Sequence, residues 1–184
     1  MQKIFLFTVA TFLLFTTTNA QDFQLGAKAG INFAQINGDN TNDFDPITEF
    51  HFGMVAEVPL SDSFSFQPEV LFSGQGYSLD DDIINLDYVN IPFLAKYYVT
   101  KGLSIEAGPQ LGFLVSAKNE NTDVKEFFSK TDLSLNIGLG YKLGSNINFA
   151  VRYNLGLSDI NDLDGFSDKY KNGVVQVSIG YFIF

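Results

Sequence analysis

Residues 88–115 read YVNIPFLAKYYVTKGLSIEAGPQLGFLV and contain two segments in which apolar and polar residues alternate, joined by Thr100-Lys101-Gly102. In both segments the odd positions are apolar, from Val89 to Val99 and from Leu103 to Val115. The even positions are mostly polar residues or glycine. Because successive side chains of a strand point to opposite faces, the pattern predicts a β-hairpin with one apolar and one polar face.

The length of each arm matches the thickness of a membrane. Each arm has about eleven residues, and with a rise of about 3.3 Å per residue and a tilt near 40° it would stand roughly 28 Å tall. The hydrocarbon core of a bilayer is about 30 Å thick. After the N-terminal region, the chain has no apolar run long enough to cross as a helix. Membrane crossing would therefore have to use strands.

The N-terminus has the features of a secretory signal peptide. Lys3 precedes an apolar run over residues 4–15, and small residues follow up to Ala20. A run of about twelve residues is too short for a transmembrane helix, which needs about twenty. We therefore predict a cleaved signal peptide over residues 1–20 and one barrel domain over residues 21–184, with an uncleaved anchor as the alternative.

The same alternation recurs along the rest of the chain. The connections between the alternating segments are in turn long and short, so the short ones gather at one end of the fold and the long ones at the other. This asymmetry is typical of outer-membrane barrels. We predict an all-β fold, an eight-stranded antiparallel up-and-down transmembrane β-barrel with three short periplasmic turns and four long extracellular loops. The expected strands are residues 23–33, 50–60, 64–72, 88–99, 103–115, 131–143, 147–157 and 173–184.

The polar faces of the strands indicate which side of the sheet points outward. A secreted, soluble, lipocalin-like barrel would show the same period with the apolar face inside. Here, however, the polar face consists mainly of Gly, Ser, Asn and Gln, and its few charges balance in sign. A narrow interior requires such balance, because buried charges must be paired. The predicted interior charge network is Lys28, Glu57, Glu69, Lys96, Glu106 and Arg152.

Two prolines interrupt the strand pattern. Pro92 and Pro109 lie in the middle of predicted strands, where proline cannot donate a ladder hydrogen bond. We expect a bulge or a local gap in the ladder at these positions.

Charge and composition limit the possible partners. The chain carries a formal net charge of −10 and no cysteine, and removal of Lys3 with the signal peptide makes it more negative. This excess of acid disfavours nucleic-acid binding. Most acidic residues fall in the predicted loops. The expected partners are outer-membrane lipid, the barrel insertion machinery and envelope proteins that contact the acidic loops.

The sequence contains little that could perform chemistry. His51 is the only histidine, and we interpret it as a hydrogen-bonded structural residue. The segment Asp162-Leu-Asp164-Gly165 invites comparison with a calcium loop, but Ile160 and Lys171 stand where that motif needs carboxylates. Solvated acidic loops are the main interpretation, with weak divalent binding as the alternative. We therefore expect no catalytic, cofactor or metal residues.

Three segments resemble a known family. Residues 88–96 (YVNIPFLAK), 107–118 (AGPQLGFLVSAK) and 26–32 (GAKAGIN) are similar to the PorT-like outer-membrane β-barrel family. The resemblance implies a barrel in the bacterial outer membrane. It also implies a possible role in an outer-membrane protein-secretion system, to which PorT belongs.

These observations lead to one main functional hypothesis and three alternatives. The main one is a non-enzymatic outer-membrane barrel with a structural or surface-interaction role. The alternatives are a PorT-like accessory component of protein secretion, a narrow channel gated by the interior charges, and a secreted lipocalin-like binding barrel. The side chains of an eight-stranded barrel just fill its interior, which disfavours an open solute pore.

Overall fold

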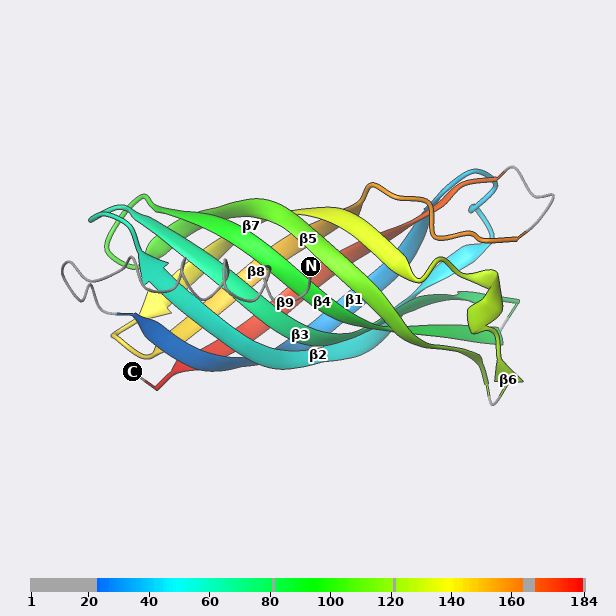
Figure 1. Ribbon diagram of the computed structural model, residues 1–184, viewed down its shortest axis with the longest axis horizontal. Coiled ribbons are helices and arrows are strands. Elements are labelled where there is room, and N and C mark those ends of the chain that lie inside the picture. The colour runs from blue at the N-terminus through cyan, green and yellow to red at the C-terminus, as the bar shows by residue number, and fades with distance from the viewer. Residues whose placement is uncertain (1–22, 81, 121, 164–167, 184) are drawn as a thin grey trace, which may run out of the picture.

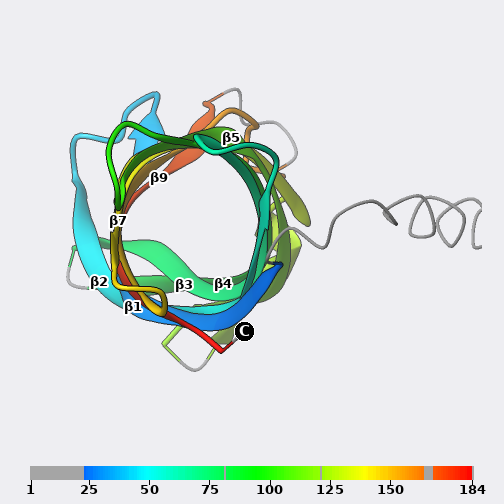
Figure 2. The same ribbon diagram turned by 90° about the vertical axis from the view of Figure 1, so that its left-hand side faces the viewer.

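The computed structural model describes residues 23–80, 82–120, 122–163 and 168–183. Eight long antiparallel strands form one closed sheet (Figures 1 and 2), in the order β4-β3-β2-β1-β9-β8-β7-β5, and the β4–β5 pairing closes it. The predicted fold class is therefore confirmed. The strands are β1 (Gln24–Gly38), β2 (Phe44–Pro59), β3 (Phe64–Leu79), β4 (Asp82–Tyr98), β5 (Leu103–Asn119), β7 (Thr131–Leu143), β8 (Ile147–Gly156) and β9 (Tyr170–Phe182).

Two small elements lie in the connection between β5 and β7. They are the two-residue strand β6 (Thr122–Asp123), which pairs with β5, and the 3-10 turn η1 (Lys125–Phe127). In the part of the chain that the structure describes, no helix has the length and apolar character needed to cross a membrane.

The apolar face of the sheet points outward. Phe50, Met54 and Tyr181 are 66%, 59% and 57% exposed, whereas the polar residues between them on the strands point into the barrel. Such an exterior suits lipid, and the soluble barrel with an apolar interior is therefore excluded. Aromatic side chains such as those of Phe64 and Tyr97, whose ring centroids are 4.9 Å apart, lie on the outward face near the strand ends, as in membrane barrels.

Three short connections lie at one end of the barrel, which we call the periplasmic end. They comprise residues 60–63, 99–102 and 144–146. Gly102 and Gly144 have φ angles of +108° and +67°, which glycine adopts without the steric cost of a side chain. These tight turns allow neighbouring strands to pair almost to their ends.

The opposite, outer end differs from the prediction. Residues 74–87 were expected to form a long loop, but most of them continue β3 to Leu79 and start β4 at Asp82, so the two strands form a long hairpin. β1, β2 and β5 also extend further in this direction, and Figure 1 shows these strands reaching beyond the outer ends of β7 and β8. The expected alternation ends here because the polarity of the faces reverses. Tyr77 and Leu86 are buried inside, while the adjacent polar residues Ser78 and Asn85, on the opposite face, are partly exposed.

The two mid-strand prolines produce gaps in the ladder without a bulge. β4 pairs with β5 at Pro92↔Gln110 and again at Ala95↔Ala107 in the same register, and the positions between them are unpaired. β3 and β4 likewise pair at Pro68↔Phe93 and at Leu71↔Asn90 around an unpaired stretch. A missing proline N–H therefore interrupts the pairing without shifting it.

Candidate functional site in the barrel lumen

The inward polar faces of the strands bring six charged side chains together in the lumen. All six come from the predicted network, and none is more than 4% exposed. They reach the lumen from different strands because each occupies an inward position of its strand. These residues are Lys28 on β1, Glu57 on β2, Glu69 on β3, Lys96 on β4, Glu106 on β5 and Arg152 on β8.

Arg152 joins two of the carboxylates. Its Nη1 and Nη2 donate to Glu69 at 2.9 and 2.8 Å, and its Nε donates to Glu106 at 2.7 Å. The fork of the guanidinium fits a carboxylate in this two-point manner, and such charge-assisted bonds are among the strongest in proteins. Arg152 therefore fixes β3 and β5 relative to β8 across the lumen.

The remaining cations extend the network in both directions. Lys28 donates to Glu69 at 3.1 Å. Lys96 lies 3.4 Å from both Glu57 and Glu106. Every buried charge of the six thus has a partner of opposite sign, which offsets the large cost of removing it from water.

Three further residues of this site were not predicted from the sequence. Lys142 on β7 lies 3.4 Å from Glu57 and also donates to Gln24. Tyr98 donates to Glu57, and Gln67 links Lys96 to Glu69. All three lie on inward positions, so following the polar faces to the ends of the strands would have identified them.

Glycines provide the space that the network occupies. A Cβ atom at Gly138 would lie 2.6 Å from Cγ of Arg152, and one at Gly140 would lie 2.3 Å from Oε1 of Glu106. Neither neighbour could keep its position beside a larger residue. The glycines on the polar faces of the strands therefore allow long charged side chains to cross the lumen.

His51 has a structural environment. Its Nε2 lies 2.8 Å from Oγ of Ser178, and nearby Asn32 hydrogen-bonds to Ser73 and Gln176. No carboxylate hydrogen-bonds to the imidazole among the described residues. In the same part of the chain, no group of three or more His, Cys, Asp or Glu side chains is placed to hold a metal ion. Asp164 and Gly165 of the possible calcium segment, and the predicted signal peptide, lie outside the described residues.

An outer apolar cluster fills the lumen at the outer end. Six of its buried members come from strands, and Phe128 and Ile160 come from the two longest outer connections. A hydrogen bond from the Ser129 N–H to the Ile160 carbonyl, at 2.9 Å, joins these two connections. Burial raises the pKa of Tyr77 in this cluster, and the neighbouring Tyr170 raises it further. The buried members are Ile36, Tyr77, Leu86, Tyr88, Leu114, Ala117, Phe128 and Ile160.

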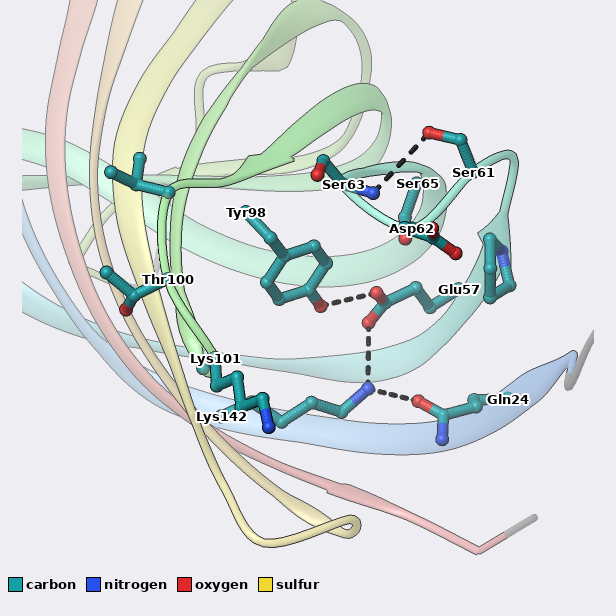
Figure 3. Close-up of a pocket in the computed structure, with 13 residues that line it drawn as sticks. Gln24, Glu57, Ser61, Asp62, Ser63, Ser65, Tyr98, Thr100, Lys101 and Lys142 are labelled. Carbon is teal, nitrogen blue, oxygen red and sulfur yellow. Dashed lines mark hydrogen bonds and ion pairs between the residues drawn. The ribbon is translucent and has the colours of Figure 1, made fainter.

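The periplasmic end, in contrast, opens into a polar cavity of about 500 Å³. Figure 3 shows Tyr98 and Glu57 beside each other in this periplasmic cavity, with Lys142 bonded to Glu57 and Gln24. The charge network lies beyond these side chains. The lumen is therefore open to the periplasm, blocked by charged groups further in, and closed by apolar side chains at the outer end.

A comparison of the chain with protein families agrees with this architecture. The model of the outer membrane protein beta-barrel domain matches residues 19–162. The chain belongs to this family. Membership confirms the broad resemblance drawn from the sequence, and it places the protein in the bacterial outer membrane.

Two solved structures show the same barrel. Neisserial surface protein A aligns with a TM-score of 0.57 at 13% identity, covering 89% of this chain and 99% of the other. Ail, the attachment invasion locus protein of Yersinia pestis, aligns with a TM-score of 0.54 at 12% identity, covering 87% and 98%. At this level of identity the likeness concerns the fold alone. No curated protein sequence matches the chain.

Proposed function

We propose that this protein is a non-enzymatic, non-conducting outer-membrane barrel that presents its outer end as a surface-interaction site. The observation that carries the proposal is the double closure of the lumen. The charge network fills the middle, and the outer apolar cluster fills the outer end. A solute would have to displace both to cross.

The energetics of the network oppose a gated channel. Opening it would separate Arg152 from Glu69 and Glu106, which are each no more than 2% exposed. Breaking one buried ion pair typically costs about 3–5 kcal/mol. The same motion would also have to open the apolar cluster, in which Leu86 and Ile160 are fully buried.

The outer end has the chemistry of a recognition surface. Its exposed carboxylates outnumber its exposed lysines, and the exposed apolar side chains of Ile83 and Phe127 lie on the same outer segments. We infer that it binds a partner with a basic surface, such as an envelope or extracellular protein. The names of the two similar structures, a surface protein and an attachment protein, are in keeping with this role. The exposed acidic residues are Asp39, Asp43, Asp45, Asp80, Asp82, Glu120, Asp123, Glu126 and Asp162.

Planar-bilayer recording tests the closed lumen. We expect no conductance steps from the wild-type protein, because the charge network and the outer apolar cluster fill the lumen. A general porin recorded in the same membrane serves as the positive control. Reproducible steps that disappear when Glu69 or Arg152 is substituted would contradict the proposal and support the gated channel.

A secretion role remains the alternative, supported by the PorT-like segments at residues 88–96 and 107–118. Crosslinking and pull-down from native outer membranes, with a tag in the loop between β1 and β2, distinguishes the two. Recovery of a constant set of envelope proteins that includes secretion components would favour the alternative. Recovery that depends on the outer carboxylates and lacks such components would favour a surface-interaction role.

A further inference from the structure

The periplasmic cavity has the dimensions of a binding site. Its volume of about 500 Å³ falls within the range of small-ligand pockets, about 300–1,000 Å³. Glu57 and Tyr98 form part of its wall, and the Lys96 and Glu106 side chains behind them are fully buried. The cavity is therefore a pocket with a fixed inner end and not the entrance to a channel.

The inner groups of the cavity are already engaged with each other. Glu57 accepts from Tyr98, Lys96 and Lys142, and Lys142 also donates to Gln24. These contacts hold the inner wall in place. They leave little free hydrogen-bonding capacity on the Glu57 carboxylate, so a ligand would take its charged contacts from the rim.

The rim carries two charges of opposite sign. Asp62 lies on the turn between β2 and β3, and Lys101 lies on the turn between β4 and β5. Among the described residues, neither side chain forms a salt bridge. Both are exposed, and Figure 3 shows them on opposite sides of the Tyr98 ring. The hydroxyl groups of Ser63 and Thr100 line the same cavity.

This arrangement selects the charge type of the ligand. A purely anionic ligand would be repelled by Asp62, and a purely cationic one by Lys101. A ligand with a separate ammonium and carboxylate group can satisfy both sides of the rim, while serine and threonine hydroxyls bond to its amides. The lining therefore fits a short zwitterionic peptide.

We propose that the periplasmic cavity binds the zwitterionic peptide of the cell wall. The cavity opens inside the ring of periplasmic turns, and its inner lining comes from inward-facing strand residues such as Glu57, Ser65 and Tyr98. It is therefore reached from the aqueous periplasm, where the cell-wall peptide lies, and not from the surrounding lipid. This site is separate from the outer surface proposed above, and it would fix the barrel to the layer beneath the membrane.

Calorimetric titration of the full-length protein in nanodiscs tests the proposal. The probe is the tripeptide L-Ala-γ-D-Glu-meso-diaminopimelate, and the comparison peptide has its amines acetylated and its carboxylates amidated. We expect saturable binding of the tripeptide, with an affinity roughly three- to fivefold weaker for Asp62→Asn and for Lys101→Gln, since each removes one exposed ion pair. The matched controls Asp82→Asn and Lys169→Gln, at the outer end, should bind as the wild type does.

Three results with the peptides would overturn the proposal. They are the absence of saturable tripeptide binding, equal binding of the blocked peptide, and unchanged affinity in both rim variants. Tighter binding of short-chain phosphatidylethanolamine than of the tripeptide would also overturn it, because the site would then serve a lipid headgroup. The rim residues are exposed, so these variants should fold, and loss of the wild-type circular dichroism spectrum would identify one that does not.

Discussion

At the scale of single residues, the lumen is organised around Arg152. Its three donor nitrogens contact Glu69 and Glu106. In the part of the chain that the structure describes, each of these carboxylates has one other cationic partner, Lys28 and Lys96 respectively. Without the guanidinium, each of these buried carboxylates would have a single lysine to compensate its negative charge. The stability of the barrel should therefore be most sensitive to this side chain.

We expect Arg152→Met to lower the free energy of unfolding by about 3–5 kcal/mol, because it leaves uncompensated buried charge. Urea unfolding in lipid vesicles measures this quantity. Lys130→Met, at an exposed position, is the matched control and should change stability by less than about 0.5 kcal/mol. Equal free energies of unfolding for the two variants would show that Glu69 and Glu106 do not depend on Arg152 for charge compensation.

The identities of these residues could be predicted, but their pairing could not. The period of two places Lys28, Glu69 and Arg152 on polar faces, and charge balance indicates a common interior. Which carboxylate meets which cation depends on the strand stagger around the closed barrel, which no local pattern encodes. The period of two also places Lys142 on a polar face, but its contact with Glu57 could not be predicted because it joins two strands that are not neighbours in the sheet.

At the scale of elements, the β3–β4 hairpin combines two types of strand. The half nearer the periplasmic end has an apolar exterior and a polar interior. The half nearer the outer end has a polar exterior and an apolar interior. The sequence predicted the first half well because a strand in lipid must alternate strongly. The half nearer the outer end lacks this alternation, because its strands pack against other protein segments and not against lipid. Gly74, Gln75 and Gly76, for example, are consecutive and all buried.

We expect Leu86→Ala to loosen the outer half of this hairpin. Leu86 is fully buried in the outer apolar cluster, and truncation of a buried leucine typically costs about 2–5 kcal/mol. Hydrogen exchange of the amides between Gln75 and Asn85 should become faster than in the wild type. Ile83→Ala, on the same strand but 45% exposed, is the control, and equal protection in both variants would contradict a role for the cluster in holding the hairpin.

At the scale of the whole molecule, the two ends of the barrel differ in both structure and access. One end is closed by apolar side chains and bears acidic loops, and the other is open and polar. The sequence predicted this polarity from the alternation of long and short connections. It did not predict the closure, because Phe128 and Ile160 come from connections without a regular pattern and reach the lumen only in the folded protein.

The absence of cysteine allows the two ends to be probed separately. We expect a membrane-impermeant maleimide too large for general porins to label Asn40→Cys in intact cells but not Ser63→Cys. Asn40 is exposed and Ser63 is half-buried at the open periplasmic end, so disruption of the outer membrane should make Ser63→Cys reactive. Labelling of Ser63→Cys in intact cells would contradict either the orientation or the closure of the barrel.

The outer apolar cluster has a consequence for the cell that carries the protein. A Gram-negative bacterium depends on its outer membrane as a barrier against detergents, antibiotics and other toxic solutes. A barrel sealed by Tyr88, Leu86 and their neighbours adds protein to that barrier without weakening it. The cell could therefore carry many copies of this protein without opening a path through the lumen for such solutes.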